Sequence, residues 1–120
     1  MQADLIKKIK QRSQGFLHLA KDCLARNEWD LACFQAEQAV QLYIKATILE
    51  KSGSLPRIHS IRQLLSVLSQ ITKVAIKFDR LAVIALEDAY FKTRYLDTVY
   101  EKSDAELAIK TAEELIALVG

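Results

Sequence analysis

The sequence predicts an all-α protein: an up-and-down bundle of about five helices, forming one domain over residues 1–120. Among the 120 residues there are only three Gly and one Pro, and residue types that favour helices dominate the remainder. No stretch alternates apolar and polar residues as a half-buried strand would. Instead, apolar residues recur at helical spacing in five stretches that turn signals separate.

The stretch 30–51 is expected to form the central helix of this bundle. Its small residues fall on one narrow stripe, which contains Ala32, Ala36, Ala39, Tyr43 and Ala46. Small side chains let neighbouring helices approach to the short end of the usual interaxial range of roughly 8–10 Å. The strip through Glu37, Gln41 and Lys45 is expected to face water.

The first helix is predicted over residues 3–26, and its apolar face is expected to contain Leu5, Ile9, Phe16, Leu19 and Cys23. Asp30 is the predicted N-cap of the second helix, and the short turn between the two predicts an antiparallel hairpin. Cys23 and Cys33 lie at similar heights on either side of this turn. They could meet there, either as a disulfide or as two buried thiols.

The remaining helices have recognisable starts. Ser60 and Gln63 have capping-box spacing at the start of a third helix, and Ser103 and Glu106 have it before the last one. Between these, a fourth helix is predicted from about residue 75 or 79 to residue 93.

Composition argues against several functional classes. The net charge is +2, which is too small for a protein that binds nucleic acid through charge alone. No apolar run approaches the roughly 20 residues that a membrane span needs, and no signal-peptide core is present, so we expect a cytoplasmic protein. Two Cys and two His far apart in the sequence do not give metal-ligand spacing, so neither a metal nor a cofactor is expected.

The segment 94–100 is the candidate ligand site. It holds Arg94, Tyr95, Asp97 and Tyr100, and the helical pattern does not require it. A guanidinium group can bind two phosphate oxygens and a tyrosine can stack on a base. We also include His59, which could face a ligand or could orient its loop. The alternative is that Arg94 pairs with Asp97 or a helix carboxylate and only fixes the loop.

A second seam on the central helix is a candidate dimer interface. It mixes leucines with amides and consists of Leu31, Gln35, Gln38, Leu42 and Leu49. Such a seam is too apolar for water and too polar for a uniform core, and this mixture suits a subunit interface. We therefore expect a two-fold homodimer.

Three motifs in their order and spacing resemble the HEPN domain family, and the resemblance covers almost the whole chain. The motifs are "WDLACFQAEQAVQLYIKA", "HSIRQLL" and "TRYLD", followed by a capped last helix. The resemblance implies a helical bundle that commonly dimerises and binds a nucleotide. Small stand-alone members often partner a minimal nucleotidyltransferase, many as toxin–antitoxin pairs. Similar folds form the C-terminal, substrate-binding part of antibiotic nucleotidyltransferases.

The catalytic branch of that family cleaves RNA with an Arg followed, after four to six residues, by a His. Arg94 matches the Arg, but the positions 99–101, where the His should stand, hold Val, Tyr and Glu. Arg12 and His18 have the same spacing on the first helix, where the family does not keep its site. The resemblance therefore implies a non-catalytic member. A ribonuclease with an atypical site and a purely structural helical partner are the alternatives.

Overall fold

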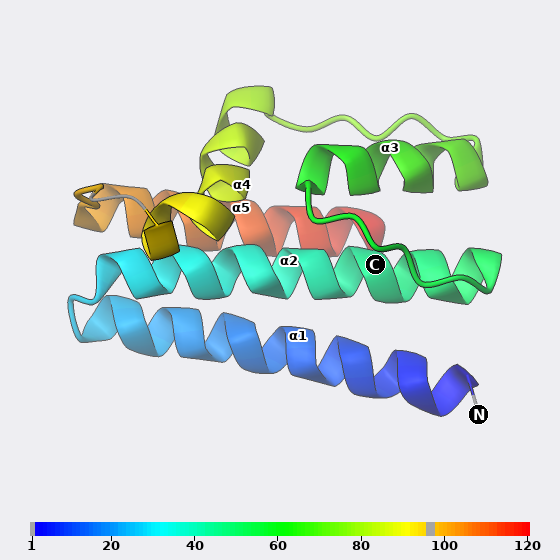
Figure 1. The fold of residues 1–120 in the computed structure, drawn as a ribbon, viewed down its shortest axis with the longest axis horizontal. Helices are drawn as coiled ribbons and strands as arrows, with labels where there is room; N and C mark the ends of the chain where they lie inside the picture. Colours follow the sequence, from blue (N-terminus) through cyan, green and yellow to red (C-terminus); the bar gives the residue numbers. More distant parts are fainter. Residues whose placement is uncertain (1, 96–97) are drawn as a thin grey trace.

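The computed structural model describes residues 2–95 and 98–120. Five helices and no strand are found in this part of the chain, which confirms the predicted all-α bundle (Figure 1). The helices are α1 (Gln2–Ala25), α2 (Trp29–Ser52), α3 (Ile61–Thr72), α4 (Arg80–Tyr95) and α5 (Lys102–Val119). Figure 1 shows α1 and α2 side by side, with α4 steeply inclined to both.

Helix α2 is the centre of the bundle, as predicted, because it contacts each of the other four helices. Its alanine stripe is fully buried, and the small side chains let α1 lie close along it. At this contact the hydroxyl group of Ser13 donates a 2.6 Å hydrogen bond to the carbonyl oxygen of Ala39. The hydrogen bond satisfies a polar group that is buried where the two helices meet.

The strip of α2 expected to face water is instead covered. Glu37 is 0% exposed and Gln41 is 4% exposed, and Lys45 is partly buried. Helix α4 packs across α2 and encloses a side of the central helix that the periodicity of the sequence assigned to solvent. The prediction for this strip was wrong, and the pKa of the buried Glu37 carboxyl group that it overlooked is affected by the charge of Arg94.

The first hairpin forms as predicted, but its details differ. Cys23 and Cys33 are both buried and both free thiols. On α1 the buried positions are Ser13, Leu17, Ala20 and Cys23. Leu5 and Leu19, which the pattern placed on the buried face, are 47% and 46% exposed.

Two predicted helix starts were two residues too late. Helix α2 begins at Trp29 with Glu28 as N-cap, so Asp30 lies in the first turn, where its charge favours the helix dipole. Helix α5 begins at Lys102, because the Asp104 carboxylate accepts a 2.8 Å hydrogen bond from the N–H of Glu101 and so stabilises an earlier start. The N-cap of α3 is confirmed: the Ser60 hydroxyl accepts a hydrogen bond from the Gln63 N–H at 3.3 Å.

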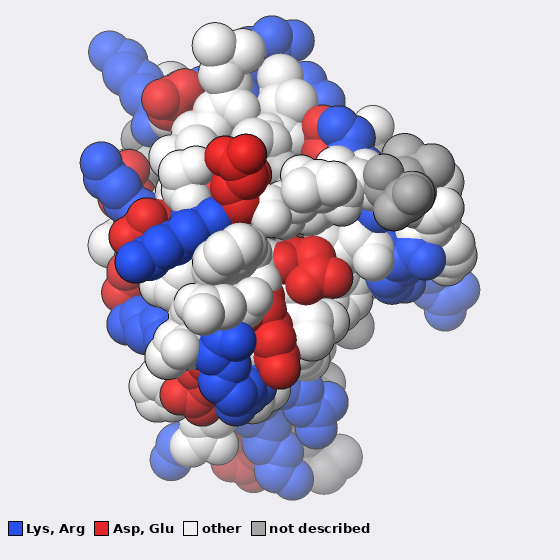
Figure 2. Space-filling model, turned by 90° about the vertical axis from the view of Figure 1, so that its left-hand side faces the viewer, with Lys and Arg blue, Asp and Glu red and all other residues white. Residues whose placement is uncertain are grey.

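Charged side chains of both signs cover the end of the molecule that carries the α1–α2 turn and the start of α5 (Figure 2). Their mixture agrees with the small net charge.

Within residues 2–95 and 98–120, no helix combines the length and apolar character needed to cross a membrane. No group of His, Cys, Asp and Glu side chains in the same residues is placed to hold a metal ion.

Candidate nucleotide-binding site

Arg94 lies in the last turn of α4, and its guanidinium group is held by both backbone and aromatic contacts. Its Nε donates a 2.8 Å hydrogen bond to the carbonyl oxygen of Tyr90, one turn earlier. Its Cζ lies 4.2 Å from the centre of the Tyr90 ring, 5.0 Å from that of Tyr95 and 5.5 Å from that of Phe34. These distances are typical of cation–π interactions. Such interactions hold the exposed guanidinium group in place without neutralising its charge.

His59 joins the same site from the segment that precedes α3. Its exposed imidazole ring stacks on Tyr90, with the ring centres 5.2 Å apart and the planes 15° from parallel. Tyr90 therefore contacts both His59 and Arg94, which are 35 positions apart in the sequence. We call Phe34, His59, Tyr90, Arg94 and Tyr95 the Arg94 cluster.

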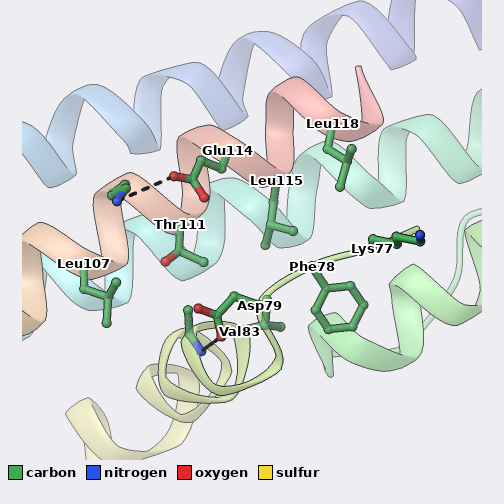
Figure 3. Close-up of a pocket in the computed structure, with 11 residues that line it drawn as sticks. Lys77, Phe78, Asp79, Val83, Leu107, Thr111, Glu114, Leu115 and Leu118 are labelled. Atoms are coloured by element: carbon green, nitrogen blue, oxygen red, sulfur yellow. Dashed lines mark hydrogen bonds and ion pairs between the residues drawn. The ribbon is translucent and has the colours of Figure 1, made fainter. Parts of the chain in front are cut away.

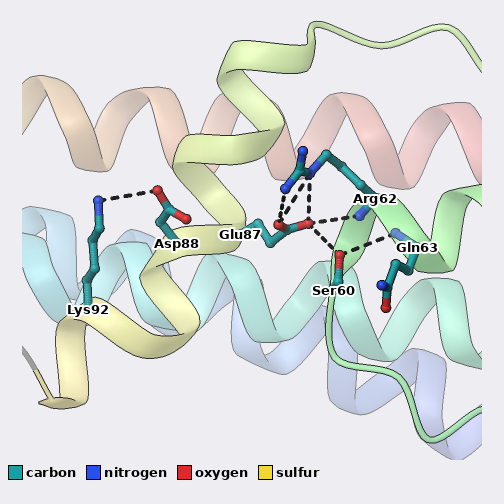
Figure 4. A network of polar contacts seen from close by, with 6 residues as sticks. All are labelled: Ser60, Arg62, Gln63, Glu87, Asp88 and Lys92. Carbon is teal, nitrogen blue, oxygen red and sulfur yellow. Dashed lines mark hydrogen bonds and ion pairs between the residues drawn. The ribbon is translucent and has the colours of Figure 1, made fainter.

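A polar network fixes the position of His59 relative to α4 (Figure 4). The Glu87 carboxylate accepts hydrogen bonds from the Ser60 hydroxyl at 2.9 Å, from the Arg62 backbone N–H at 3.0 Å and from Arg62 Nη2 at 2.9 Å. Ser60 directly follows His59, and Glu87 lies one turn before Tyr90. The network therefore aligns the two rings that stack.

The pKa of Glu87 reflects this network. Burial by itself would raise the pKa, but the hydrogen bonds from the Arg62 side chain and backbone and from Ser60 outweigh burial, and the pKa is lowered. Glu87 is therefore ionised at neutral pH and able to hold Arg62.

Among the residues that the structure describes, Arg94 has no ion-pair partner, so its charge is available to a ligand. None of the ion pairs formed by residues 2–95 and 98–120 involves its guanidinium group. Asp97, the partner considered in the structural alternative, lies outside the described residues, as does its own predicted place in the site.

Glu37 is a buried acid on α2, and the charge of Arg94 affects its pKa. Its carboxylate accepts hydrogen bonds from Nε2 of Gln38 at 2.8 Å and from Nε2 of Gln41 at 2.5 Å. Burial raises its pKa to about 7, and the two amide hydrogen bonds and the charges of Lys45 and Arg94 oppose that rise. Near neutral pH, Glu37 therefore exchanges between a charged and an uncharged state within the field of Arg94.

Tyr100, which was predicted for the same site, lies in a different environment. It is partly buried and lines a cavity of about 40 Å³ together with Cys33 and Asp104. Burial, and then the negative charge on neighbouring groups, raises the pKa of Tyr100 to about 12, so its hydroxyl group stays protonated. Of the five predicted site residues, the structure thus brings together Arg94, Tyr95 and His59.

The sequence analysis missed Tyr90, Glu87 and Glu37. Tyr90 precedes Arg94 by four residues, the spacing at which two helical side chains meet, so a search for a partner of Arg94 could have found it. Glu87 and Glu37 carry no such signal, because each acts through contacts between helices that the sequence does not specify.

Comparison with known families gives the class of protein. The profile of the HEPN domain family matches residues 6–120, and the chain belongs to this family. A search of curated proteins found no significant match.

Solved structures share the fold. The crystal structure of TT1696 from Thermus thermophilus is similar with a TM-score of 0.81 and 26% identity, over 95% of this chain and 94% of that one. ST0689, described as an archaeal HEPN homologue, is similar with a TM-score of 0.71 and 19% identity, over 95% and 93% of the two chains. At that identity the second likeness concerns the fold alone.

Proposed function

We propose that this HEPN-domain protein is a non-catalytic module that binds a nucleotide or a phosphate group of RNA at the Arg94 cluster. The observation that carries the proposal is the exposed guanidinium group of Arg94, which aromatic rings hold in place without a described carboxylate to neutralise it. An arginine so placed can bind two phosphate oxygens, and the exposed Tyr95 beside it offers a surface for a base. No cofactor or metal is required.

The absence of catalysis follows from the family's own chemistry. Ribonucleases of the family need a His soon after the Arg, and positions 99–101 hold Val, Tyr and Glu. Tyr100 is no substitute as a proton acceptor, because the pKa of its phenol is raised to about 12. Arg12 and His18, the other Arg–His pair with the family's spacing, are both exposed on α1, where the family does not keep its site.

Titration with fragments of a nucleotide tests the binding proposal. AMP, adenosine and inorganic phosphate are each titrated into the protein by calorimetry. We expect AMP to bind more tightly than either fragment, since it alone engages both the guanidinium group and the aromatic surface. If adenosine binds as well as AMP, the phosphate makes no contribution and the proposal is wrong.

The proposal includes a homodimer formed through the seam on α2. Leu31 is 45% exposed, and Gln35, Gln38 and Leu42 are half-buried, so these four side chains keep surface for a partner, whereas Leu49 is buried within the chain. A second subunit could therefore pack on the exposed part of these four side chains.

The cellular partner we propose is a minimal nucleotidyltransferase, in a toxin–antitoxin-type pair. Support comes from membership of the HEPN family. The test is co-expression with a short nucleotidyltransferase encoded by a neighbouring gene, followed by size-exclusion chromatography. Separate elution of the two proteins would contradict the partnership.

A second candidate function is an RNA-cleaving HEPN protein with an atypical site. The observation in its favour is that His59 and Arg94 contact the same Tyr90 ring, so an imidazole reaches the cluster from another part of the chain. Incubation of a labelled RNA with the protein and with a His59→Ala variant decides between the two functions. If the protein cleaves the RNA and His59→Ala abolishes cleavage, the non-catalytic proposal is wrong. If the RNA stays intact with both proteins, the non-catalytic proposal is supported.

A further inference from the structure

Glu37 is a buried acid that takes part in no ion pair within residues 2–95 and 98–120. Its side chain is 0% exposed, and the hydrogen bonds that it accepts come from the neutral amide groups of Gln38 and Gln41. A carboxylate buried without a counter-ion in contact is costly, so this group takes up a proton more readily than an exposed glutamate does.

Arg94 is close enough to act on this acid. The guanidinium carbon lies 5.5 Å from the centre of the Phe34 ring on α2. Phe34 precedes Glu37 by three positions, the spacing at which the side chains of one helix are neighbours. The positive charge of Arg94 accordingly opposes the rise that burial causes in the pKa of Glu37.

Two cations act on Glu37, Arg94 from α4 and Lys45 from its own helix. Lys45 is partly buried, and burial lowers its pKa while the charge of Glu37 opposes that change. Among the described residues, no ion pair or side-chain hydrogen bond joins Glu37 to α1, α3 or α5. Histidine commonly changes charge near neutral pH, so an experiment on the Arg94 cluster has to separate His59 from Glu37.

We propose that Glu37 is a proton switch for the Arg94 cluster, which binds a phosphate-containing ligand more tightly when Glu37 is protonated. An ionised Glu37 offsets part of the positive charge that Arg94 presents to a phosphate group, and protonation removes this offset. Because linkage is reciprocal, a bound phosphate group favours the protonated form of Glu37, and binding takes up protons. This inference rests on the proposed function, since it needs a ligand at Arg94.

The test uses 3′,5′-cyclic AMP, whose phosphodiester group keeps one charge between pH 6 and pH 8. It is titrated by calorimetry into the parent and into Glu37→Gln, which keeps the shape of the protonated acid. At pH 8 we expect the variant to bind about three- to fivefold more tightly, for two charges roughly 10 Å apart of which one is in solvent. At pH 6 the two proteins should bind nearly equally. His59 is present in both, so its titration cancels in the comparison.

Glu114→Gln is the matched control, because it also removes one negative charge. Glu114 lines a separate cavity between α5 and the start of α4 (Figure 3). The part of α4 that lines this cavity ends at Val83, roughly 16 Å along the helix from Arg94. The control variant should therefore bind cyclic AMP like the parent at both pH values.

A measurement without ligand follows Glu37 directly. The side-chain carboxyl signals of the glutamates are recorded by ¹³C NMR as the pH is raised, in the parent and in Arg94→Ala. Loss of the positive charge should make Glu37 bind its proton about three- to fivefold more tightly, the same coupling seen from the other side. Arg80→Ala, at the start of α4, should leave the Glu37 titration unchanged.

The switch is overturned, and the proposed function stands, if Glu37→Gln binds cyclic AMP like the parent at pH 8 or gains the same factor at both pH values. It is also overturned if Arg94→Ala leaves the Glu37 titration unchanged, a result that does not depend on whether Glu37→Gln folds. If cyclic AMP binds to none of the proteins at either pH, the switch and the proposed function both fail.

Discussion

At the scale of single residues, the carboxyl group of Glu37 is the feature with the clearest physical consequence. It is completely buried on α2 among Gln38, Gln41 and Lys45 of its own helix, and Arg94 acts on it from α4. Its pKa is about 7 in the folded protein, against an ordinary value of 4.5. The folded state therefore binds a proton that the unfolded state releases.

This difference predicts how stability depends on pH. The stabilisation from the protonated acid is fully present below about pH 4.5 and is lost as the pH rises to about 7. Glu37→Gln, which keeps the shape and removes the charge, should raise the free energy of unfolding at pH 8 by about 2–3 kcal/mol and have little effect at pH 4.5. Urea unfolding at the two pH values measures this effect.

The control is Glu50→Gln on the same helix, because the Glu50 carboxylate is half exposed and its one ion pair within residues 2–95 and 98–120 is with Lys10. It should change stability by less than about 0.5 kcal/mol at either pH. If Glu37→Gln destabilises the protein at pH 8 as well as at pH 4.5, the carboxylate is favourable where it lies and our account of the site is incorrect.

The two cysteines make a second prediction at this scale. Burial raises the pKa of both thiols, that of Cys33 to about 12, and both side chains are less than 5% exposed. A thiol reacts through its thiolate form, so both should be labelled by a maleimide much more slowly in the native protein than in denaturant. Rapid labelling of both in the native state would show that α1 and α2 pack differently.

At the scale of the helices, the contact between α3 and α4 depends on Glu87. Glu87→Gln removes the charge from the hydrogen bonds that Glu87 accepts from Ser60 and Arg62, and Arg62 is partly exposed, so solvent reduces the loss. We expect the free energy of unfolding at pH 7 to fall by about 1–2 kcal/mol. Because the pKa of Glu87 is lowered, this contribution is present above the ordinary value of 4.5 and is lost as the pH falls through the folded-state pKa.

Thermal unfolding of Glu87→Gln at pH 7 and pH 3 measures the effect, with Glu114→Gln on α5 as control, since its ion pair with Lys110 is long and exposed. The same change should loosen the stacking of His59 on Tyr90, which the His59 ring signals in NMR spectra would report. A variant as stable as the parent at pH 7 would show that the network does not hold α3 to α4.

The sequence was sufficient to predict the helices but not which sides they bury. Periodicity and capping residues located all five helices, with starts wrong by two residues at Trp29 and Lys102. The burial of Glu37 and Gln41 depends on how steeply α4 crosses α2, and no local sequence pattern encodes that crossing angle. Arg94 and Tyr95 were predicted as site residues. Tyr90 was overlooked although its spacing of four residues from Arg94 signals a contact, and Glu87 was overlooked because it acts through contacts between helices.

At the scale of the whole molecule, the seam on α2 predicts assembly. Leu31, Gln35, Gln38 and Leu42 form a partly exposed strip on the central helix that no helix of the described chain covers completely. We expect light scattering at micromolar concentration to give the mass of a homodimer, and Leu31→Lys, a charge at the exposed leucine of the seam, to give the mass of a monomer. The matched control is Leu81→Lys on α4, where the leucine is 75% exposed and lies outside the seam.

A monomer mass for the parent protein would contradict the dimer directly. A dimer that dissociates with Leu81→Lys and not with Leu31→Lys would place the interface elsewhere.

The central claim is that Arg94 binds a phosphate group and is not only a structural contact, and the effect of Arg94→Ala tests it most directly. ATP, GTP and a short RNA are titrated by calorimetry into the parent, into Arg94→Ala and into Arg80→Ala, whose arginine starts the same helix. We predict that Arg94→Ala weakens binding by about 1.5–3 kcal/mol, as for a charged hydrogen bond, with the melting temperature nearly unchanged and Arg80→Ala like the parent. The claim is contradicted if no ligand gives heat with the parent protein while Arg94→Ala lowers its melting temperature, since Arg94 would then only fix the end of α4.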